Sequence, residues 1–297
     1  MPEMVQRPIV GIAGLGLVGL ALAKRLACAG FTVLGFDLDP ARNALLDVQA
    51  NGAARASVER LAADCDCMLI AVFDDAQLRA VAADLLAATG RRVSQAICIT
   101  TALPVTLREV GALCAATGLR FVEAPISGSS ARIAAGEGRM FVGGTPADIE
   151  RAAPVLDAIT VHRNRIGEVG QASAAKLSTN LVLGLNRLAL AEGMALAESL
   201  GIERARYLEL LLDSAATSRA AREKGPMMVA DHYEPPVATI AQHAKDVRLM
   251  LELGRETGQA LPLSELHLAL LAQSMARGDT HLDNAAIIRT LRPARAT

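Results

Sequence analysis

The 297-residue sequence has no tryptophan and only two tyrosines and five phenylalanines. Proteins that bind single-stranded nucleic acids stack the bases on aromatic rings, and this chain has few rings to offer. Its 30 basic and 31 acidic side chains give a net charge of −1, which leaves no basic surplus to attract a phosphate backbone. We therefore expect no nucleic-acid partner.

Long apolar runs and paired cysteines are missing as well. No uninterrupted apolar stretch reaches the roughly 18 residues typical of a membrane-spanning helix, so we expect no membrane partner. The five cysteines include no C-x-x-C pair, which argues against a disulfide framework and against a zinc site. The five histidines show no ligand spacing. We expect buried free thiols, no bound metal and a soluble cytoplasmic protein.

The most informative stretch runs from residue 8 to residue 37. Residues 8–13 predict a buried strand, a glycine-rich turn follows, and an apolar helical run leads to a second strand that ends at Asp37. The turn has the pattern Gly-x-Gly-x-x-Gly and consists of Gly14, Leu15, Gly16, Leu17, Val18 and Gly19. In such turns the first glycine permits the bend, the second admits the pyrophosphate, and the third lets helix and strand pack closely. We predict a dinucleotide-binding site at these six residues.

Asp37 bears on the choice of dinucleotide. A carboxylate at the end of the second strand accepts hydrogen bonds from the ribose hydroxyls and repels a 2′-phosphate. The next residue is Leu38 rather than an arginine, and we interpret Arg42, five positions after Asp37, as a solvated helix residue. The sequence favours NAD over NADP as the cofactor.

Strand-like and helix-like segments alternate through the first half of the chain. Short apolar runs at residues 67–73, 95–100, 119–123 and 140–142 predict buried strands. This alternation predicts an α/β domain with a Rossmann-type doubly wound sheet, which binds its ligand at the carboxyl ends of the strands. Val72, near the end of one strand, is a further candidate contact of the cofactor.

The composition changes near residue 170. Residues 172–200 contain no proline and are rich in alanine and leucine, and a single helix of that length would be about 43 Å long. The remaining sequence has helical patterns that we expect to break at Gly225-Pro226, Pro235-Pro236 and Pro262. We predict a NAD-binding Rossmann-type domain at residues 1–165 and an all-helical substrate and oligomerisation domain at residues 166–297, with the active site in the cleft between them.

Two further motifs carry candidate chemistry. Ser127, Gly128 and Ser129 follow a predicted strand and offer hydroxyl and N–H donors to a carboxylate, although a loop without a ligand has the same composition. Lys176 and Asn180 are four positions apart and therefore lie on one face of the long helix. A lysine on a helix is most often a solvated charge, but this one has apolar neighbours that favour burial. Burial lowers the pKa of a lysine and makes it a usable general base.

Together these motifs resemble those of the β-hydroxyacid dehydrogenases, the family of 3-hydroxyisobutyrate dehydrogenase and tartronate semialdehyde (2-hydroxy-3-oxopropionate) reductase. The resemblance covers nearly the whole chain. The glycine turn matches the start of the family, residues 123–129 match its Asp-Ala-Pro-Val-Ser-Gly-Gly substrate loop, and residues 176–180 match its Lys-x-x-Asn-Asn helix. Residues 100–104 match its Ser-Thr-x-x-Pro segment, and residues 245–246 match its late Lys-Asp pair.

The resemblance implies hydride transfer between a nicotinamide and a small 3-hydroxy acid or its semialdehyde or keto form. It implies that Lys176 is the general acid and base and that Asn180 assists it. It places Thr101 near the nicotinamide and Lys245 on the cofactor. The implied substrate-binding residues are Ser127, Gly128, Ser129, Lys176 and Asn180. By the same resemblance we expect a homodimer or a homotetramer.

Four residues depart from the family pattern. Glu123 stands in place of aspartate, Ser129 in place of the second loop glycine, Ala172 in place of a glycine, and Thr179 in place of the first asparagine. Because the lysine and the second asparagine are retained, catalysis is still implied, while the altered pocket leaves the particular 3-hydroxy acid open. Two alternatives stay open beside this one: an imine or other carbonyl reductase of the same architecture, and a non-catalytic dehydrogenase-like scaffold.

Overall fold

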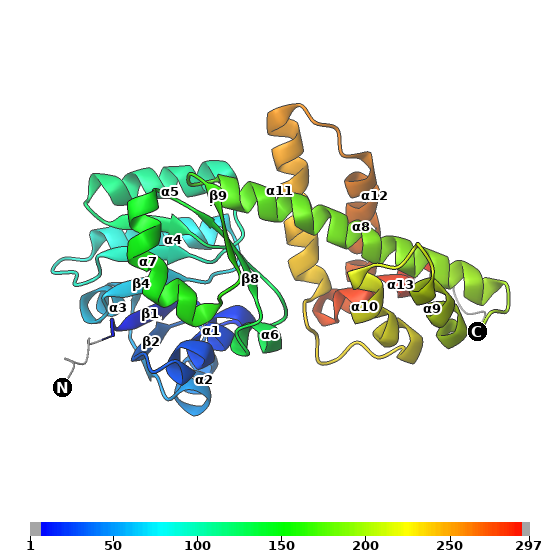
Figure 1. Ribbon diagram of the computed structural model, residues 1–297, viewed down its shortest axis with the longest axis horizontal. Coiled ribbons are helices and arrows are strands. Elements are labelled where there is room, and N and C mark those ends of the chain that lie inside the picture. The colour runs from blue at the N-terminus through cyan, green and yellow to red at the C-terminus, as the bar shows by residue number, and fades with distance from the viewer. Residues whose placement is uncertain (1–6, 293–297) are drawn as a thin grey trace. The chain divides into compact units, whose positions relative to one another are not determined.

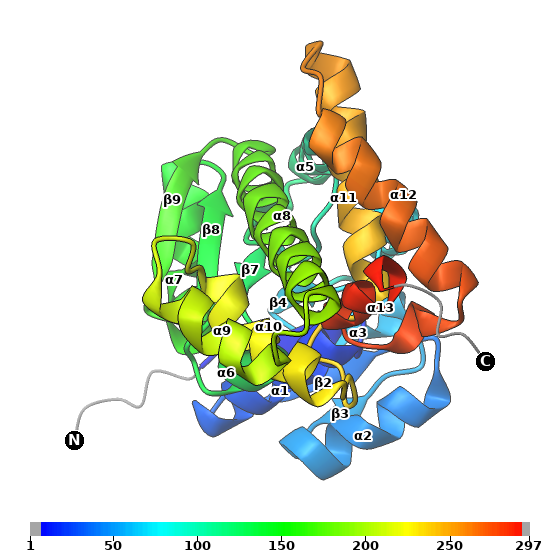
Figure 2. The same ribbon diagram turned by 90° about the vertical axis from the view of Figure 1, so that its right-hand side faces the viewer.

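The computed structural model describes residues 7–292 of the chain. The chain forms two compact units, Met1–Lys176 and Leu177–Thr297, and the boundary between them falls within one long helix. Figures 1 and 2 show the two units from perpendicular directions.

A nine-stranded sheet lies at the centre of the first unit, within the described residues. Its strands are β1 (Val10–Ala13), β2 (Val33–Phe36), β3 (Ala53–Ala54), β4 (Cys67–Ile70), β5 (Gln95–Cys98), β6 (Arg120–Glu123), β7 (Ile126–Ser127), β8 (Arg139–Gly143) and β9 (Arg163–Gly167). Their order is β3-β2-β1-β4-β5-β6-β8-β7, with β9 paired to β8. Strands β1 to β6 are parallel, whereas β8 runs antiparallel to β6 and β7. The order of the parallel strands is that of a dinucleotide-binding doubly wound sheet, so the predicted Rossmann-type fold is confirmed.

Helices cover both faces of this sheet (Figure 1). They are α1 (Leu17–Cys28), α2 (Pro40–Ala50), α3 (Val58–Asp64), α4 (Asp75–Ala87), α5 (Pro104–Ala116), α6 (Ser130–Ala134) and α7 (Pro146–Ile159). Leu22 of α1 and Leu156 of α7 belong to one buried cluster, and Leu78 of α4 and Leu107 of α5 belong to a second. Because both faces are covered, the central strands are apolar throughout, which is why they appear in the sequence as continuous apolar runs.

Strand β9 was not predicted. Its sequence, Arg-Asn-Arg-Ile-Gly, is mostly exposed and has no alternation of apolar and polar residues. It pairs in parallel with β8 at the margin of the sheet, where backbone hydrogen bonds rather than burial hold it in place. A search for apolar periodicity cannot find a strand of this kind.

The second unit is helical. Its helices are α8 (Gln171–Ser199, which begins in the first unit), α9 (Arg204–Asp213), α10 (Arg219–Ala230), α11 (Ile240–Thr257), α12 (Pro262–Ala276) and α13 (Ile288–Leu291), with short 3₁₀ turns at Asp279–His281 and Asn284–Ile287. Helix α8 confirms the long helix predicted at residues 172–200, and the predicted breaks at Pro235-Pro236 and Pro262 also lie outside helices or at a helix start. No helix within residues 7–292 is long and apolar enough to cross a membrane.

The predicted break at Gly225-Pro226 is wrong. Helix α10 continues through both residues. Proline within a helix removes one backbone hydrogen bond, but here Lys224, Gly225 and Met228 are buried, and a Cβ at Gly225 would lie 2.4 Å from Cδ1 of Leu208. Packing of α10 against α9 therefore outweighs the local preference of the dipeptide.

The cysteines are free, and four of the five are buried in the first unit. Burial raises the pKa of the Cys65 thiol to about 12 and that of Cys114 to about 11, and it raises the pKa values of Cys67 and Cys98 as well. The expectation of buried thiols fails at Cys28, the last residue of α1, which is exposed.

Candidate functional site

The glycine turn connects β1 to α1 and is tightly packed at two of its three glycines. Gly14 has φ +96°, and a Cβ there would lie 2.5 Å from the carbonyl oxygen of Ala71. A Cβ at Gly19 would lie 1.9 Å from the carbonyl oxygen of Gly14. At Gly16, the residue before α1, no atom lies within 4 Å of the Cβ position. The turn is thus closed on the protein side and open beside the helix N-terminus, as a bound pyrophosphate requires.

The carboxylate of Asp37 lies against this turn. The N–H of Leu15 donates to Asp37 Oδ2 at 2.7 Å, and the N–H of Asp39 donates to Oδ1 at 2.9 Å. Arg42 Nη1 lies 3.5 Å from Asp37 Oδ2, so Arg42 is ion-paired although half of its side chain is exposed. Asp37 therefore fixes the glycine turn in addition to presenting a negative charge at the end of β2.

Val72 and Thr101 follow the carboxyl ends of β4 and β5, which are neighbours in the sheet. The N–H of Val72 donates to the hydroxyl of Thr100 at 3.0 Å, and that hydroxyl donates to the carbonyl oxygen of Val72 at 3.1 Å. Thr101 is buried. The buried Thr100 side chain thus joins the two segments at the edge where the glycine turn also lies.

Glu123 anchors the start of helix α8. Its side chain is fully buried at the end of β6, and its carboxylate accepts hydrogen bonds from the N–H groups of Gly170 at 2.6 Å, Ala172 at 2.8 Å and Ser173 at 3.2 Å. Burial raises the pKa of this carboxyl group, and the three N–H donors oppose the rise. A Cβ at Gly143 would lie 2.4 Å from Glu123 Oε1, so the strand beside Glu123 has room for the carboxylate only because residue 143 is glycine.

Lys176 lies on the second turn of the helix that Glu123 anchors. It is 9% exposed, and its ammonium donates a hydrogen bond to the carbonyl oxygen of Ile126. Ser173, on the preceding turn, donates from its hydroxyl to the carbonyl oxygen of Ala102 at 2.6 Å. The first two turns of α8 are therefore fixed to Glu123 at the end of β6, to the segment that follows β5 and to the first residue of β7. Lys176 thus adjoins the predicted substrate loop.

The predicted substrate loop follows directly from the residue that Lys176 contacts. Ser127 ends the short strand β7 and pairs with Arg139 of β8. Gly128 has φ +141°, a conformation that favours glycine. The hydroxyl of Ser129 accepts a hydrogen bond from the N–H of Arg132 at 3.2 Å and caps α6. Ser129 thus has a structural role that the sequence did not predict, and its hydroxyl keeps its donor.

Asn180 and Lys245 lie in the second unit and share one neighbour. Asn180 is one turn beyond Lys176 along α8, and its Nδ2 donates to Asp246 Oδ2 at 3.3 Å. Lys245 Nζ lies 3.0 Å from Asp246 Oδ1. Asp246, the second residue of the Lys-Asp pair, links the two predicted residues.

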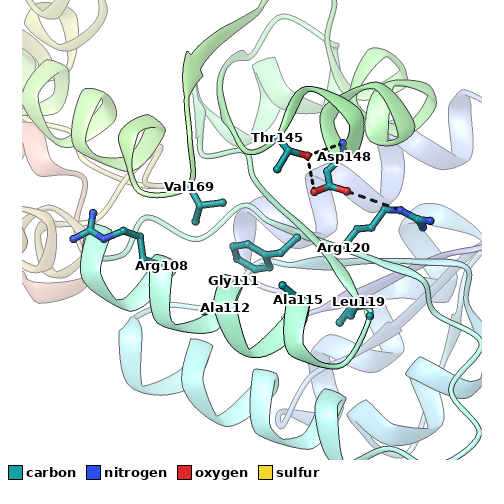
Figure 3. A pocket seen from close by; sticks show the side chains of 11 residues that line it. Arg108, Gly111, Ala112, Ala115, Leu119, Arg120, Thr145, Asp148 and Val169 are labelled. Atoms are coloured by element: carbon teal, nitrogen blue, oxygen red, sulfur yellow. Dashed lines mark hydrogen bonds and ion pairs between the residues drawn. The ribbon is translucent and has the colours of Figure 1, made fainter.

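A pocket of about 410 Å³ in the first unit lies elsewhere. Figure 3 shows that its walls come from α5 and from the segment around Thr145 and Asp148, whose side chains are hydrogen-bonded at 2.8 Å. Arg120 lines it at the amino end of β6, the end of the sheet opposite to the glycine turn and Lys176. The pocket contains none of the predicted site residues. Residues 7–292 also contain no cluster of three or more potential metal ligands.

The roles of Glu123, Ser173 and Thr100 are not among those that the sequence predicts. One signal for Glu123 was present: the residue before α8 is Gly170, which has no side chain to cap the helix. The first N–H groups of a helix need acceptors, so a buried acceptor from elsewhere in the chain was required. The sequence does not say which residue supplies it.

The glycine turn yields a prediction that separates binding from folding. Gly16→Ala is expected to change the free energy of unfolding by less than about 1 kcal/mol and to weaken NAD binding at least about tenfold, because its Cβ projects into open space at the phosphate position. Gly19→Ala is expected to destabilise the first unit, because its Cβ collides with the backbone. Thermal unfolding of both variants measures the effect on stability, and NAD titration measures the effect on cofactor affinity. Equal effects of the two substitutions on stability would contradict it.

Comparison with known proteins gives two family matches that divide the chain. Residues 9–169 match the family described as the NAD binding domain of 6-phosphogluconate dehydrogenase. Residues 170–291 match the family described as NAD-binding of NADP-dependent 3-hydroxyisobutyrate dehydrogenase.

Relatives that match nearly the whole chain include proteins named 3-hydroxyisobutyrate dehydrogenase, as the family matched by residues 170–291 is. A protein of Mycobacterium tuberculosis named probable 3-hydroxyisobutyrate dehydrogenase is 30% identical over 95% of this chain and 97% of its own length. L-threonate dehydrogenase of Cupriavidus necator is also 30% identical, over 94% of this chain and 95% of its own. The crystal structure of 3-hydroxyisobutyrate dehydrogenase from Salmonella typhimurium has a TM-score of 0.84 at 29% identity, over 94% of this chain and 98% of that one. An imine reductase of Myxococcus stipitatus, at 18% identity and a TM-score of 0.66 over 96% of this chain and 100% of that one, shares the fold alone.

Proposed function

The chain belongs to the β-hydroxyacid dehydrogenase family, and from this premise we propose that Lys176 is the general acid and base that serves hydride transfer to and from a small 3-hydroxy acid. Membership makes the protein an NAD(P)-dependent oxidoreductase that acts on CH–OH groups. One observation carries the proposed role of Lys176: its ammonium is hydrogen-bonded to Ile126, the residue before the Ser127–Ser129 loop.

The residues of the first unit fit a dinucleotide. Gly16 leaves open space at the N-terminus of α1, and Asp37 supplies a carboxylate at the end of β2. When bound, NAD(P) supplies the hydride acceptor or donor. We propose that Gly14 to Gly19, Asp37, Val72, Thr101 and Lys245 contact it.

The chain itself must move one proton. In the oxidising direction, neutral Lys176 accepts the proton of the substrate hydroxyl; in the reducing direction, its ammonium donates that proton to the forming alkoxide. Asn180, one turn along α8, orients the substrate or the amine through its amide. Ser127 and Gly128 hold the substrate carboxylate with hydroxyl and N–H donors, and Ser129 contributes the donor that its capping role leaves available.

The substrate is tested by initial rates on a panel of acids with NAD and with NADP. The panel comprises 3-hydroxyisobutyrate, glycerate, threonate and 3-hydroxypropionate, with lactate as a 2-hydroxy control and with 2-hydroxy-3-oxopropionate for the reducing direction. Turnover of a 3-hydroxy acid and none of lactate is the expected result. Normal NAD binding with no turnover on the whole panel would contradict the proposal and favour an imine substrate or a scaffold role.

We propose NAD as the preferred cofactor, on the basis of Asp37. We expect kcat/KM for NAD to exceed that for NADP by at least about 10², because a 2′-phosphate would approach this carboxylate. Asp37→Ser is expected to lower the ratio of kcat/KM for NAD to that for NADP at least about tenfold. It also removes one of the two ion pairs of Arg42 and leaves the one with Asp39. Asp47→Ser, at an exposed position of α2, is the matched control. An unchanged ratio in Asp37→Ser would contradict the assignment.

We also propose a homodimer or homotetramer and a cytoplasmic location. Exposed apolar side chains on α8, among them Val182 and Leu196, support self-association, since they lie two heptads apart on one helix. The free thiols support a reducing compartment. Light scattering of the purified chain measures the number of subunits.

A further inference from the structure

Arg187 is a buried charge with unused hydrogen-bond donors within residues 7–292. It lies on the part of α8 that belongs to the second unit and is 4% exposed. Its Nε and Nη2 atoms have no hydrogen-bond partner within residues 7–292. Burial lowers the pKa of the guanidinium to about 10, with Asp283 and Asp246 opposing the change, so Arg187 stays charged at neutral pH. Burying a charge whose donors are unused is costly, and the site therefore calls for a ligand.

Two buried imidazoles adjoin the same stretch of α8. Gly184 precedes Arg187 by three positions, which places both on one helix face. A Cβ at Gly184 would lie 2.7 Å from Nε2 of His243 and 3.2 Å from Cε1 of His267, and the ring centroids are 4.9 Å apart. His243 comes from α11 and His267 from α12, which lie side by side in both ribbon views (Figure 2).

The nitrogen atoms on these rings are also unused. Nε2 of His243 and Nε2 of His267 have no hydrogen-bond partner among the residues that the structure describes. Burial and the charge of Arg187 lower the pKa of both imidazoles, that of His267 to about 4. The rings are therefore neutral at neutral pH, and each can carry its proton on Nε2 as a donor.

The surrounding charges leave one positive charge uncompensated. Asp283 is bound by Lys224 at 2.7 Å and also accepts hydrogen bonds from three backbone N–H groups, those of residues 237, 238 and 285. Asp246 pairs with the lysine that precedes it. Each nearby carboxylate is thus already ion-paired with a lysine, although Oδ1 of Asp246 has no hydrogen-bond partner within residues 7–292. The positive charge of Arg187 is therefore the one that these ion pairs leave uncompensated.

We propose that Arg187, His243 and His267 together bind a small inorganic anion of the size of chloride. Guanidinium Nε and Nη2 and the two imidazole Nε2 atoms donate to it, and its charge compensates that of Arg187. A water molecule satisfies donors but carries no charge, which is why the geometry points to an anion. The small size follows from the burial of all three side chains and from the close packing of the two imidazoles on Gly184. This site includes none of the residues assigned to hydride or proton transfer.

The test is thermal unfolding of the full chain in sodium chloride and in sodium gluconate at equal ionic strength. We expect Tm to rise by about 4 °C when chloride reaches roughly 100 times its Kd. Bromide should raise Tm as chloride does. Gluconate is too large to enter the site and should not raise Tm. Arg187→Met is expected to abolish the difference between the salts. Arg248→Met, at an exposed position of α11, is the matched control and should keep the difference in Tm between the two salts.

A second measurement does not depend on the folding of any variant. Crystals of the native chain soaked in bromide are expected to show an anomalous-scattering peak within hydrogen-bonding distance of Arg187 and the two histidines. The proposal is overturned if chloride and gluconate have the same effect on Tm of the native chain, if Arg187→Met retains the chloride effect, or if the bromide crystals show no peak at this place.

Discussion

Replacing Lys176 by alanine is expected to lower kcat at least about 10²-fold while leaving the affinity for NAD essentially unchanged. The side chain adjoins the Ser127–Ser129 loop through its hydrogen bond to Ile126 and takes no part in the glycine turn, so its loss removes proton transfer and spares the cofactor site. Steady-state kinetics with the best acid of the panel measure kcat, and titration calorimetry with NAD measures the affinity for the cofactor.

Three further variants show whether Lys176→Ala acts through lost proton transfer or through lost packing. Lys176→Met keeps the buried methylene chain and should be as inactive as the alanine variant, which separates chemistry from packing. Lys176→Arg keeps a positive charge that cannot be removed at neutral pH and should also be inactive in oxidation. Lys24→Ala, at an exposed position of α1, should behave as the native enzyme. Near-native kcat in Lys176→Met would remove Lys176 from the mechanism.

Glu123→Ala is expected to lower the free energy of unfolding by about 3 kcal/mol and to reduce kcat as well. The substitution leaves the N–H groups of Gly170, Ala172 and Ser173 buried without their acceptor. Those groups form the start of the helix that holds Lys176, so the position of the ammonium should become less well defined. Urea denaturation gives the stability, and single-turnover rates give the effect on chemistry.

The controls for Glu123 rest on hydrogen-bonding capacity. Glu123→Gln keeps one carbonyl oxygen that can serve Gly170 and Ala172, and it should lose less stability than the alanine variant. Glu150→Ala removes an exposed glutamate of α7 and should change neither quantity. If Glu123→Ala unfolded at the native urea concentration, the carboxylate would not be the anchor of α8.

The sequence predicts the dinucleotide turn well because everything it needs is local. Strand β1, Gly14 to Gly19 and α1 are consecutive, and Asp37 follows at the end of the next strand, so spacing alone brings them together. The paired residues Lys176 and Asn180 are likewise placed by the period of one helix. Their roles in catalysis and binding stay predictions until the variants are measured.

The rest of the site depends on contacts between distant parts of the chain. Glu123 contacts residues 47 to 50 positions away, and no periodicity in the sequence links the two segments. Pro226 is the opposite case: its local preference is clear, but burial of α10 overrides it. Nothing in the sequence around Arg187 distinguishes it from an exposed arginine of a helix. Only the packing of α11 and α12 on α8 reveals that it is buried.

The distribution of the cysteines makes the native chain convenient to label. Four thiols are buried and have raised pKa values, so a maleimide finds one accessible sulfur, that of Cys28. This residue ends α1, about 18 Å along the helix from the end that adjoins the glycine turn. A fluorophore attached there labels the dinucleotide-binding unit at a single position, and no cysteine has to be engineered.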